Sequence, residues 1–268
     1  MYSVDEMRAY ADRLGFGEAY MAEKDYLQEL LLRALFSRIV GDRLVFRGGT
    51  ALAKIYGSGR FSDDLDFVVN RFKKEDALLS RVEDAIRSIK DLYEMTFTGP
   101  ETYRDMVGYN IKINGPLFVS SKHEASRQTV SLNINMYEKI ILAPVSIIRT
   151  PIYNDIPPYS LSVKQLEELL MDKIAALMER KRLPARDLYD IWVILAKNQN
   201  NLDESKIKKV YDAYCKNKEK IDYPALASRI DALSGVWKKE IGSLMNLSID
   251  FDVVARDAKS RLKEILGL

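Results

Sequence analysis

Two short motifs within residues 46–69 carry residue types suited to phosphate and metal chemistry. Gly48 and Gly49 form a glycine pair, which lets backbone N–H groups approach a phosphate more closely than residues with a Cβ would. Asp64 and Asp66 alternate with apolar residues, so a strand would point both carboxylates to one side. Two carboxylates on a rigid face, completed by substrate phosphates, suit Mg²⁺, with Mn²⁺ as a substitute. Together the motifs predict nucleotidyl transfer from a nucleoside triphosphate (NTP).

The elements that position these motifs follow from the local pattern. Apolar residues 44–46 predict a short buried strand that ends at the glycines, and residues 50–56 predict a short helix whose start Thr50 would cap. Residues 64–69 predict a second strand. Apolar spacing close to 3.6 predicts a helix over residues 20–40, and residues 74–93 also read as helical.

The rest of the chain divides into an alternating part and a helical part. Residues 106–114 and 128–136 alternate apolar and polar side chains, which predicts an antiparallel strand pair, and residues 140–145 predict another short strand. A proline-bearing segment, 150–159, marks the expected boundary. Helical patterns follow over residues 162–182, 184–198, 205–217, 224–233, 237–245 and 250–266. We therefore predict an α+β protein, with a mixed-sheet domain at 1–150 and a helical domain at 151–268.

Composition narrows the functional classes. The chain has 268 residues and a formal net charge of +2, so nucleic-acid binding would need a local basic patch. A single cysteine, Cys215, excludes an internal disulfide framework, and a single histidine, His123, argues against a His-rich zinc site. No apolar run approaches the roughly 20 residues that span a bilayer, and no signal peptide is recognisable. We expect a cytoplasmic protein without a membrane partner.

Other phosphate-binding motifs do not match. Gly49 is followed by Thr-Ala-Leu-Ala-Lys, with no second glycine before Lys54, so the segment is not a P-loop. A dinucleotide fingerprint beginning at Gly57 fails because Ser62 stands where its third glycine belongs. A plain tight turn at the glycines and a solvated acidic face at the strand remain as alternatives.

The segments GGTALAK and GRFSDDLDF resemble the signature of the AbiEii/AbiGii-type toxin nucleotidyltransferases, a family that includes the MenT toxins and lies within the polymerase-β-like superfamily. Residues 166–195, LEELLMDKIAALMERKRLPARDLYDIWVIL, resemble the later motifs of the same family. The resemblance covers both halves of the chain. It implies a nucleotidyltransferase fold in the N-terminal domain, transfer of a nucleoside monophosphate from an NTP to tRNA or another RNA, and a cognate antitoxin protein.

The resemblance also implies roles for individual residues. Asp64 and Asp66 would be catalytic and hold the metal, and Lys173 and Asp187 would be catalytic from the helical domain, in a cleft between the domains. The residues expected to bind the nucleotide are Gly48, Gly49, Thr50, Lys54, Arg60, Ser62 and Asp190. The sequence leaves a simpler alternative open, in which Asp187 is an acid in the first turn of a helix and Lys173 is its ion-pair partner.

One position departs from the superfamily pattern. Polymerase-β-like transferases usually supply a third carboxylate from a later strand, which acts as a general base or as a ligand of a second metal. The expected strand offers Asn133 and Asn135 instead, and Glu138 lies too far along to be equated with it. An amide oxygen can coordinate a metal but is not a useful base. The sequence therefore leaves open which group acts as the general base and whether a second metal ion binds.

The acceptor is less well defined by the sequence. Basic residues cluster at 181–182 with Arg186, at 206–209, at 216–220 and at 238–239, where they could contact RNA phosphates or simply form solvated helix faces. Two other functions compete with the toxin prediction. One is a regulatory module that binds an NTP without transferring it, and the other is a small-molecule nucleotidyltransferase of the antibiotic-modifying type.

Overall fold

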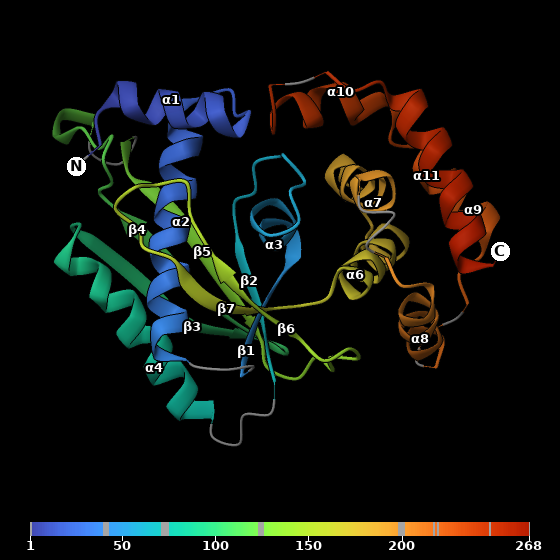
Figure 1. Cartoon of the computed structure of the whole chain (residues 1–268), viewed down its shortest axis with the longest axis horizontal. Helices are drawn as coiled ribbons and strands as arrows, with labels where there is room; N and C mark the ends of the chain where they lie inside the picture. The colour runs from blue at the N-terminus through green and yellow to red at the C-terminus, as the bar shows by residue number, and fades with distance from the viewer. Residues whose placement is uncertain are drawn as a thin grey trace. The chain divides into compact units, whose positions relative to one another are not determined.

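A mixed β-sheet organises the first part of the chain in the computed structural model (Figure 1), which describes residues 2–39, 43–70, 75–122, 126–197, 202–216, 218, 220–246 and 248–267. Within these residues the sheet has seven strands in the order β3-β4-β5-β2-β1-β7-β6. The strands are β1 (Leu44–Arg47), β2 (Leu65–Val69), β3 (Met95–Tyr103), β4 (Met106–Ile113), β5 (Gln128–Asn135), β6 (Val145–Arg149) and β7 (Tyr159–Val163). The helices of this part are α1 (Val4–Leu14), α2 (Ala19–Arg38), α3 (Gly48–Lys54) and α4 (Glu75–Arg87).

The register of the central strands creates one row of residues across the sheet. β1 and β2 run antiparallel with Arg47 opposite Asp66, β2 and β5 run parallel with Asp66 beside Asn133, and β4 and β5 run antiparallel with Gly108 opposite Asn133. The predicted antiparallel pair over residues 106–114 and 128–136 is confirmed as β4 and β5. The row brings Arg47, Asp66, Asn133 and Gly108 to one face of the sheet.

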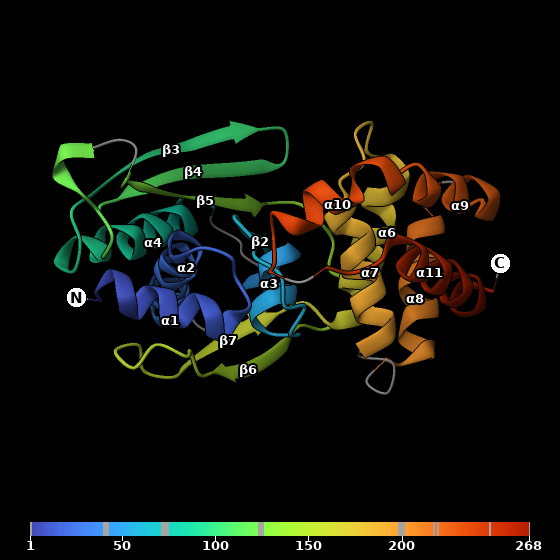
Figure 2. The same cartoon turned by 90° about the horizontal axis from the view of Figure 1, so that it is seen from above.

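The two faces of the sheet differ in burial. On β5, Val130, Leu132 and Ile134 are fully buried, while the residues between them are only half-buried. Helices α2 and α4 lie along one face of the sheet (Figure 2), and the alternation of β5 matches a strand covered on one side. Asp66 and Asn133 are half-buried and belong to the less covered face.

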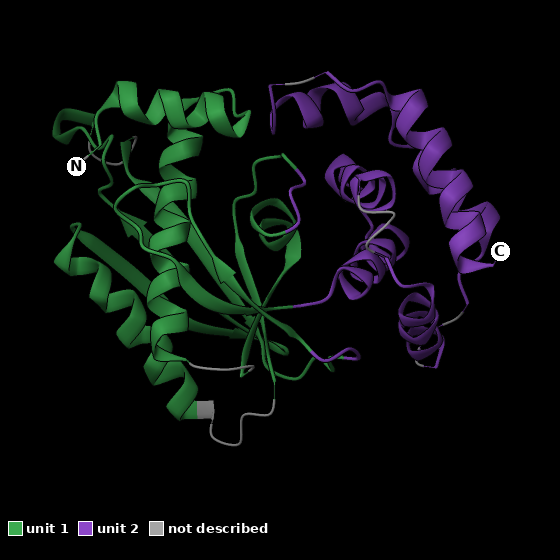
Figure 3. Ribbon diagram, in the orientation of Figure 1, with its two compact units in different colours: residues 1–55, 59–140, 144–163 green, residues 56–58, 141–143, 164–268 purple. Residues whose placement is uncertain are grey.

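The chain separates into two compact units (Figure 3). Unit 1 comprises residues 1–55, 59–140 and 144–163, and unit 2 comprises residues 56–58, 141–143 and 164–268. The described helices of unit 2 are α6 (Leu166–Glu179), α7 (Ala185–Lys197), α8 (Glu204–Cys215), α9 (Tyr223–Asp231), α10 (Ser234–Gly242) and α11 (Phe251–Leu266). The predicted α+β class, with a mixed sheet followed by helices, is confirmed.

Several local predictions need correction. Residues 159–163 form strand β7, which pairs with β1 and β6, so the sheet continues past the predicted boundary at residue 150 and the units divide after Val163. Residues 95–103 form strand β3, which we did not predict, and β6 lies at 145–149 rather than 140–145. The predicted helix ends at residues 40, 74, 198 and 217 lie outside the described residues, as does His123.

In the described part of the chain, no helix is both long and apolar enough to cross a membrane.

Candidate active site

The glycine pair makes room for side chains of the protein itself. Gly48 has φ +78°, a left-handed conformation that favours glycine, and a Cβ placed there would lie 2.5 Å from Asp66 Oδ2. At Gly49, a Cβ would lie 2.5 Å from the Arg60 guanidinium and 3.0 Å from Ser62 Oγ. The two glycines therefore allow Asp66, Arg60 and Ser62 to close onto the start of α3.

Thr50 connects the two motifs, though not in the way we predicted. The residue that precedes α3 is Arg47, and Thr50 lies within the helix, so Thr50 is not its cap. Its Oγ1 instead donates to the Asp64 carbonyl oxygen and contacts Ser62 Oγ at 2.9 Å. Because Thr50 is fully buried, these contacts fix the approach of the acidic motif to the glycine motif.

Helix α2 holds the loop that carries Ser62 and Asp64. Gln28 Nε2 donates to the carbonyl oxygens of Ser62 and Asp63, each at 2.9 Å. Lys24 Nζ pairs with Asp63 Oδ1 at 2.7 Å. Asp63 thus points to α2, while its neighbour Asp64 is bound through its carbonyl group to Thr50. Backbone contacts at three successive residues leave the loop little freedom.

Asp66 has a polar neighbour on the adjacent strand. Asn133 Nδ2 donates to Asp66 Oδ1 at 3.1 Å, whereas Asp66 Oδ2 is the oxygen that faces Gly48. The amide therefore stands where the superfamily pattern predicted a carboxylate. Glu138, further along the chain, pairs with Arg47, and Asn135 Nδ2 donates to the same carboxylate at 3.3 Å.

Lys54 lies in a buried ion cluster within unit 1, away from the role in nucleotide binding that we expected. Its side chain is 2% exposed, and its ammonium lies 2.5 Å from Asp25 Oδ1 and 3.3 Å from Glu29 Oε1. Arg149 Nη2 lies 2.8 Å from the same Glu29 oxygen, and Arg149 Nη1 donates to the Lys54 carbonyl oxygen at 2.7 Å. The last residue of α3 is thereby attached to α2 and β6.

Two tyrosines complete this cluster. Tyr159 donates to Glu29 Oε2 at 2.7 Å, and Tyr153 donates to Asp25 Oδ2 at 3.0 Å. Burial and the neighbouring carboxylates raise the pKa of both tyrosines well above 10, so they keep their protons and act as donors. Burial by itself would raise the pKa of Glu29, but Lys54 and Arg149 outweigh it and hold that pKa below its ordinary 4.5.

The second set of predicted residues forms an ion cluster within unit 2. Lys173 Nζ lies 2.8 Å from Asp187 Oδ1 and 2.8 Å from Asp190 Oδ2, so the lysine of α6 is shared by two acids one turn apart on α7. Arg180 Nη1 lies 2.6 Å from Asp187 Oδ2. Both acids are fully buried, whereas the side chain of Arg180 is 49% exposed. The ion pair that the sequence offered as the simpler alternative is present.

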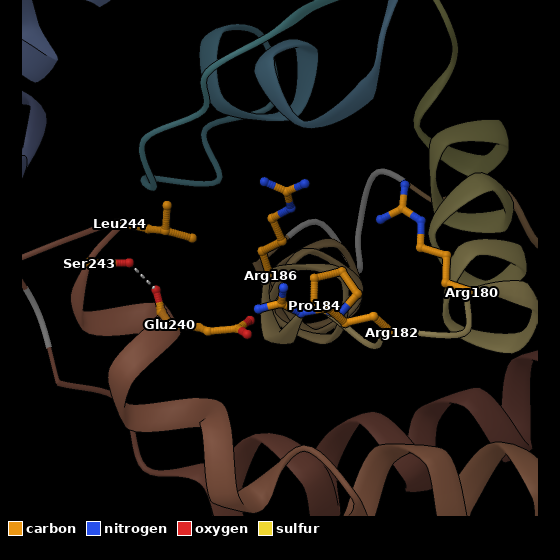
Figure 4. A pocket seen from close by; sticks show the side chains of 7 residues that line it. All are labelled: Arg180, Arg182, Pro184, Arg186, Glu240, Ser243 and Leu244. Atoms are coloured by element: carbon orange, nitrogen blue, oxygen red, sulfur yellow. Dashed lines mark hydrogen bonds between the residues drawn. The ribbon is translucent and has the colours of Figure 1, made fainter.

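An arginine-lined pocket lies beside this cluster, in the same unit (Figure 4). It has a volume of about 450 Å³, and its lining residues are Arg180, Arg182, Pro184, Arg186, Glu240, Ser243 and Leu244. Glu240 Oε2 accepts a hydrogen bond from the Ala185 amide at 2.8 Å, at the first residue of α7. The predicted basic cluster at 181–182 with Arg186 thus contributes two arginines to one concave surface.

Comparison with known proteins gives the family. A family model described as nucleotidyl transferase AbiEii toxin, type IV toxin–antitoxin system, matches residues 30–262, which is most of the chain. The chain belongs to the AbiEii family. The protein is therefore a nucleotidyltransferase, and the family implies a nucleotide substrate and a cognate antitoxin.

Solved structures show the same fold as this AbiEii-family protein. The JHP933 protein of Helicobacter pylori is 18% identical, with a TM-score of 0.58, and the match covers 92% of each chain. A Helicobacter pylori protein described as a candidate nucleotidyltransferase is 21% identical, with a TM-score of 0.60, and covers 91% of this chain and 96% of its own. No curated protein matches the chain.

This AbiEii-family chain has carboxylates that fit a divalent metal ion. Transferases of this kind generally use such an ion, and hard cations such as Mg²⁺ take a few carboxylates with phosphate and water oxygens. Asp64 and Asp66 would supply two carboxylates, and Asp66 Oδ2 lies so close to Gly48 that a Cβ there would come within 2.5 Å of it. No group of three His, Cys, Asp or Glu side chains gathers at one point in the described residues, so substrate oxygens would complete the shell.

Some residues around the site were not identified from the AbiEii sequence. The sequence placed Lys24 and Gln28 on the polar side of a predicted amphipathic helix and gave no reason to connect them with the site. Arg47 follows the predicted first strand, and no motif marks it as a site residue. The bond from Asn133 to Asp66 depends on the parallel pairing of β2 with β5, which joins residues far apart in the chain. Local spacing carries no signal for such a pairing. Lys173, Asp187 and Asp190 lie in unit 2, and a shared site with Asp64 and Asp66 stays a prediction.

Proposed function

We propose that this AbiEii-family enzyme transfers a nucleoside monophosphate from an NTP to an RNA acceptor, with Asp64 and Asp66 holding Mg²⁺ or Mn²⁺. The observation that carries the proposal is the approach of Asp66 Oδ2 to Gly48, beside the contacts of Thr50 with Ser62 and Asp64. When bound, such an ion offsets the charge that develops on the α-phosphate and its leaving group. The chain then needs to position the reactants, with little covalent chemistry of its own.

The motif residues differ in burial, and we use this difference to separate residues that would contact the ligands from residues that hold the motifs in place. Asp64, Asp66 and Ser62 are half-buried, and we assign them to contact with the ion and the phosphates. Thr50 and Arg60 are fully buried, at 1% and 2% exposure, so we assign them to hold the two motifs together. Lys54 supports the same motif from the far end of α3, through its ion pairs with Asp25 and Glu29.

The helical unit contributes charge to the proposed reaction. Lys173 and Arg180 together carry two positive charges, which match the two carboxylates of Asp187 and Asp190. We propose that Lys173 offsets charge on the triphosphate, and that Asp187 and Asp190 set its position. The side chain of Lys173 is 11% exposed, which leaves part of it accessible.

The arginine-lined pocket supports an RNA acceptor. Arg182 and Arg186 are exposed, and neither has an ion-pair partner among the described residues. Arginine forks match phosphate oxygens, and phosphate contacts supply most of the affinity for RNA. We propose that the pocket holds acceptor phosphates, and that tRNA is the acceptor to test first. NTPs and RNA meet in the cytoplasm, where we expect the reaction to take place.

Transfer from a labelled NTP tests the enzymatic proposal. Each α-labelled NTP is incubated with Mg²⁺, total RNA and the protein, or its Asp64→Asn or Asp63→Asn variant. We expect label in RNA with the wild type, a loss of at least about 1,000-fold in Asp64→Asn, and activity close to wild type in Asp63→Asn, whose acid pairs with Lys24 instead. NTP binding without label in any acceptor indicates a regulatory module, and label only in a small molecule indicates the antibiotic-modifying type. Undiminished transfer by Asp64→Asn contradicts the metal role.

Charge reversal at the pocket tests the acceptor site. We expect Arg182→Glu with Arg186→Glu to weaken RNA binding by about 10-fold or more and to flatten its salt dependence. The matched control reverses two exposed lysines on α8, Lys208→Glu with Lys209→Glu, with the same change in net charge. Equal losses in both double variants would indicate general electrostatic attraction instead of a specific pocket.

A further inference from the structure

Asn133 has a defined relation to the acidic pair. It lies beside Asp66 in the parallel register of β2 and β5, and its amide group donates to Asp66 Oδ1 at 3.1 Å. A carboxylate oxygen can only accept, so the nitrogen of the amide must face Asp66. The amide oxygen points to the β4 side, where a Cβ at Gly108 would lie 3.7 Å from it. One oxygen of Asp66 is therefore occupied, and its orientation is fixed.

The charges near this position suit one divalent ion. Asp64 and Asp66 together carry a charge of about −2, and no third acidic, histidine or cysteine side chain joins them at one point in the described part of the chain. Glu138 does not fill the gap, because its carboxylate pairs with Arg47 and accepts from Asn135. Two divalent ions about 4 Å apart repel strongly and need further anionic ligands between them. A neutral amide supplies none.

We propose that Asn133 is a positioning residue that orients Asp66 and limits the site to one divalent ion, shared between the two aspartates and the triphosphate. The inference rests on the proposed metal role of Asp64 and Asp66. It implies that the charge of the residue at position 133 decides how many ions bind. An aspartate there would add a carboxylate next to Asp66, and the repulsion between the two would be relieved by a second ion.

Counting bound Mn²⁺ by electron paramagnetic resonance tests the proposal without relying on turnover. The protein is titrated with Mn²⁺ in the presence of a non-hydrolysable NTP analogue. We expect one ion per chain in the wild type and two in Asn133→Asp. The matched control is Asn110→Asp on β4, where the side chain contacts Ser131 Oγ at 3.4 Å instead of an acid, and we expect one ion there. Asn133→Ala should bind one ion about 10-fold more weakly, because the orienting bond to Asp66 is lost.

Thermal unfolding with and without Mn²⁺ gives a second measurement. Asn133→Asp should gain more stability from Mn²⁺ than the wild type or Asn110→Asp, because the ion relieves repulsion that only this variant contains. Two ions in the wild type, or one ion in a folded Asn133→Asp, overturns the proposal while leaving the nucleotidyl-transfer proposal intact. If Asn133→Asp does not fold even with Mn²⁺, the number of Mn²⁺ ions bound by the wild type alone tests the proposal. Absence of any bound ion in the wild type overturns both proposals.

Discussion

Each unit buries a lysine between two carboxylates with an arginine beside them, and the exposure of that arginine is the main difference between the two clusters. In unit 1, Lys54 lies between Asp25 and Glu29, and its side chain is 2% exposed. In unit 2, Lys173 lies between Asp187 and Asp190, and its side chain is 11% exposed. The arginines differ more, since Arg149 is 21% exposed and Arg180 is 49% exposed.

The difference indicates which cluster can serve a ligand. Tyr153 and Tyr159 close the cluster of unit 1 with two further donors, so its carboxylate oxygens are satisfied within the protein. The cluster of unit 2 has Arg180 at its open side, and Arg180 also lines the arginine-lined pocket. The same kinds of side chains thus form a cluster with a mostly buried arginine in one unit and a cluster with a half-exposed arginine in the other.

Removal of Lys54 should give the largest effect. Lys54→Met leaves Asp25 and Glu29 buried with less compensation, so we expect the free energy of unfolding to fall by about 3–5 kcal/mol in urea titrations. The double variant Lys54→Met with Glu29→Gln also removes one of the two buried negative charges and should recover part of the loss. A loss below about 1 kcal/mol in the single variant would show that the cluster does not hold α3 to α2.

Lys173→Met should destabilise less and affect nucleotide binding more. Because Arg180 keeps its ion pair with Asp187 when Lys173 is removed, we expect a loss of about 1–3 kcal/mol in the free energy of unfolding. If Lys173 offsets charge on the triphosphate, the Kd for an NTP measured by calorimetry should rise by about 10-fold or more. Lys173→Arg, which keeps the charge, is the control. An unchanged Kd in folded Lys173→Met contradicts the proposed role and leaves Lys173 as a purely structural residue.

Acid should weaken the cluster of unit 1 through Glu29. Lys54 and Arg149 overcome the effect of burial and hold the pKa of Glu29 below 4.5 in the folded chain. Unfolding then takes up a proton, so the stability that Glu29 contributes is complete above pH 4.5 and is lost as the pH falls through its folded pKa. Urea titrations across this range should show a smaller pH dependence for Glu29→Gln than for the wild type. An identical dependence would mean that other groups control acid unfolding.

Arg180→Ala should have the smallest effect on stability. The guanidinium is half-exposed, and Asp187 keeps its ion pair with Lys173, so we expect a loss of no more than about 1 kcal/mol. Arg149→Ala is the comparison, because Arg149 is more buried and also donates to the carbonyl oxygen of Lys54. Equal losses in the two variants would remove the distinction between a closed and an open cluster.

Local patterns predicted the elements that contain strong periodicity. The strand pair β4 and β5 and helices α8 to α11 each bury one face and so repeat apolar residues at the spacing of their own secondary structure. Helices α2, α6 and α7 carry the same spacing, although polar residues on their other faces are buried too. Strand β7 was missed because its buried residues directly precede a helical pattern. Strand β3 was missed because its edge position leaves many of its side chains exposed, so alternation is weak.

In the candidate site, too, local spacing predicted some features and not others. The glycine pair, the two aspartates and the later lysine and acids carry local spacing, which sufficed to predict the family and the class of chemistry. Lys54 was expected to bind the nucleotide and Lys173 to be catalytic, and both are lysines in helical segments. Their neighbours separate them, and those neighbours come from α2 in one case and from α7 in the other.

Sequence alone thus determined the α+β class and the family, because both are encoded in the spacing of residues close together in the chain. Tertiary structure decided that Asn133 lies against Asp66, that Glu138 pairs with Arg47, and that Thr50 binds the Asp64 carbonyl oxygen instead of capping a helix. These contacts depend on strand register and on how the elements pack, which bring together side chains that no local pattern relates.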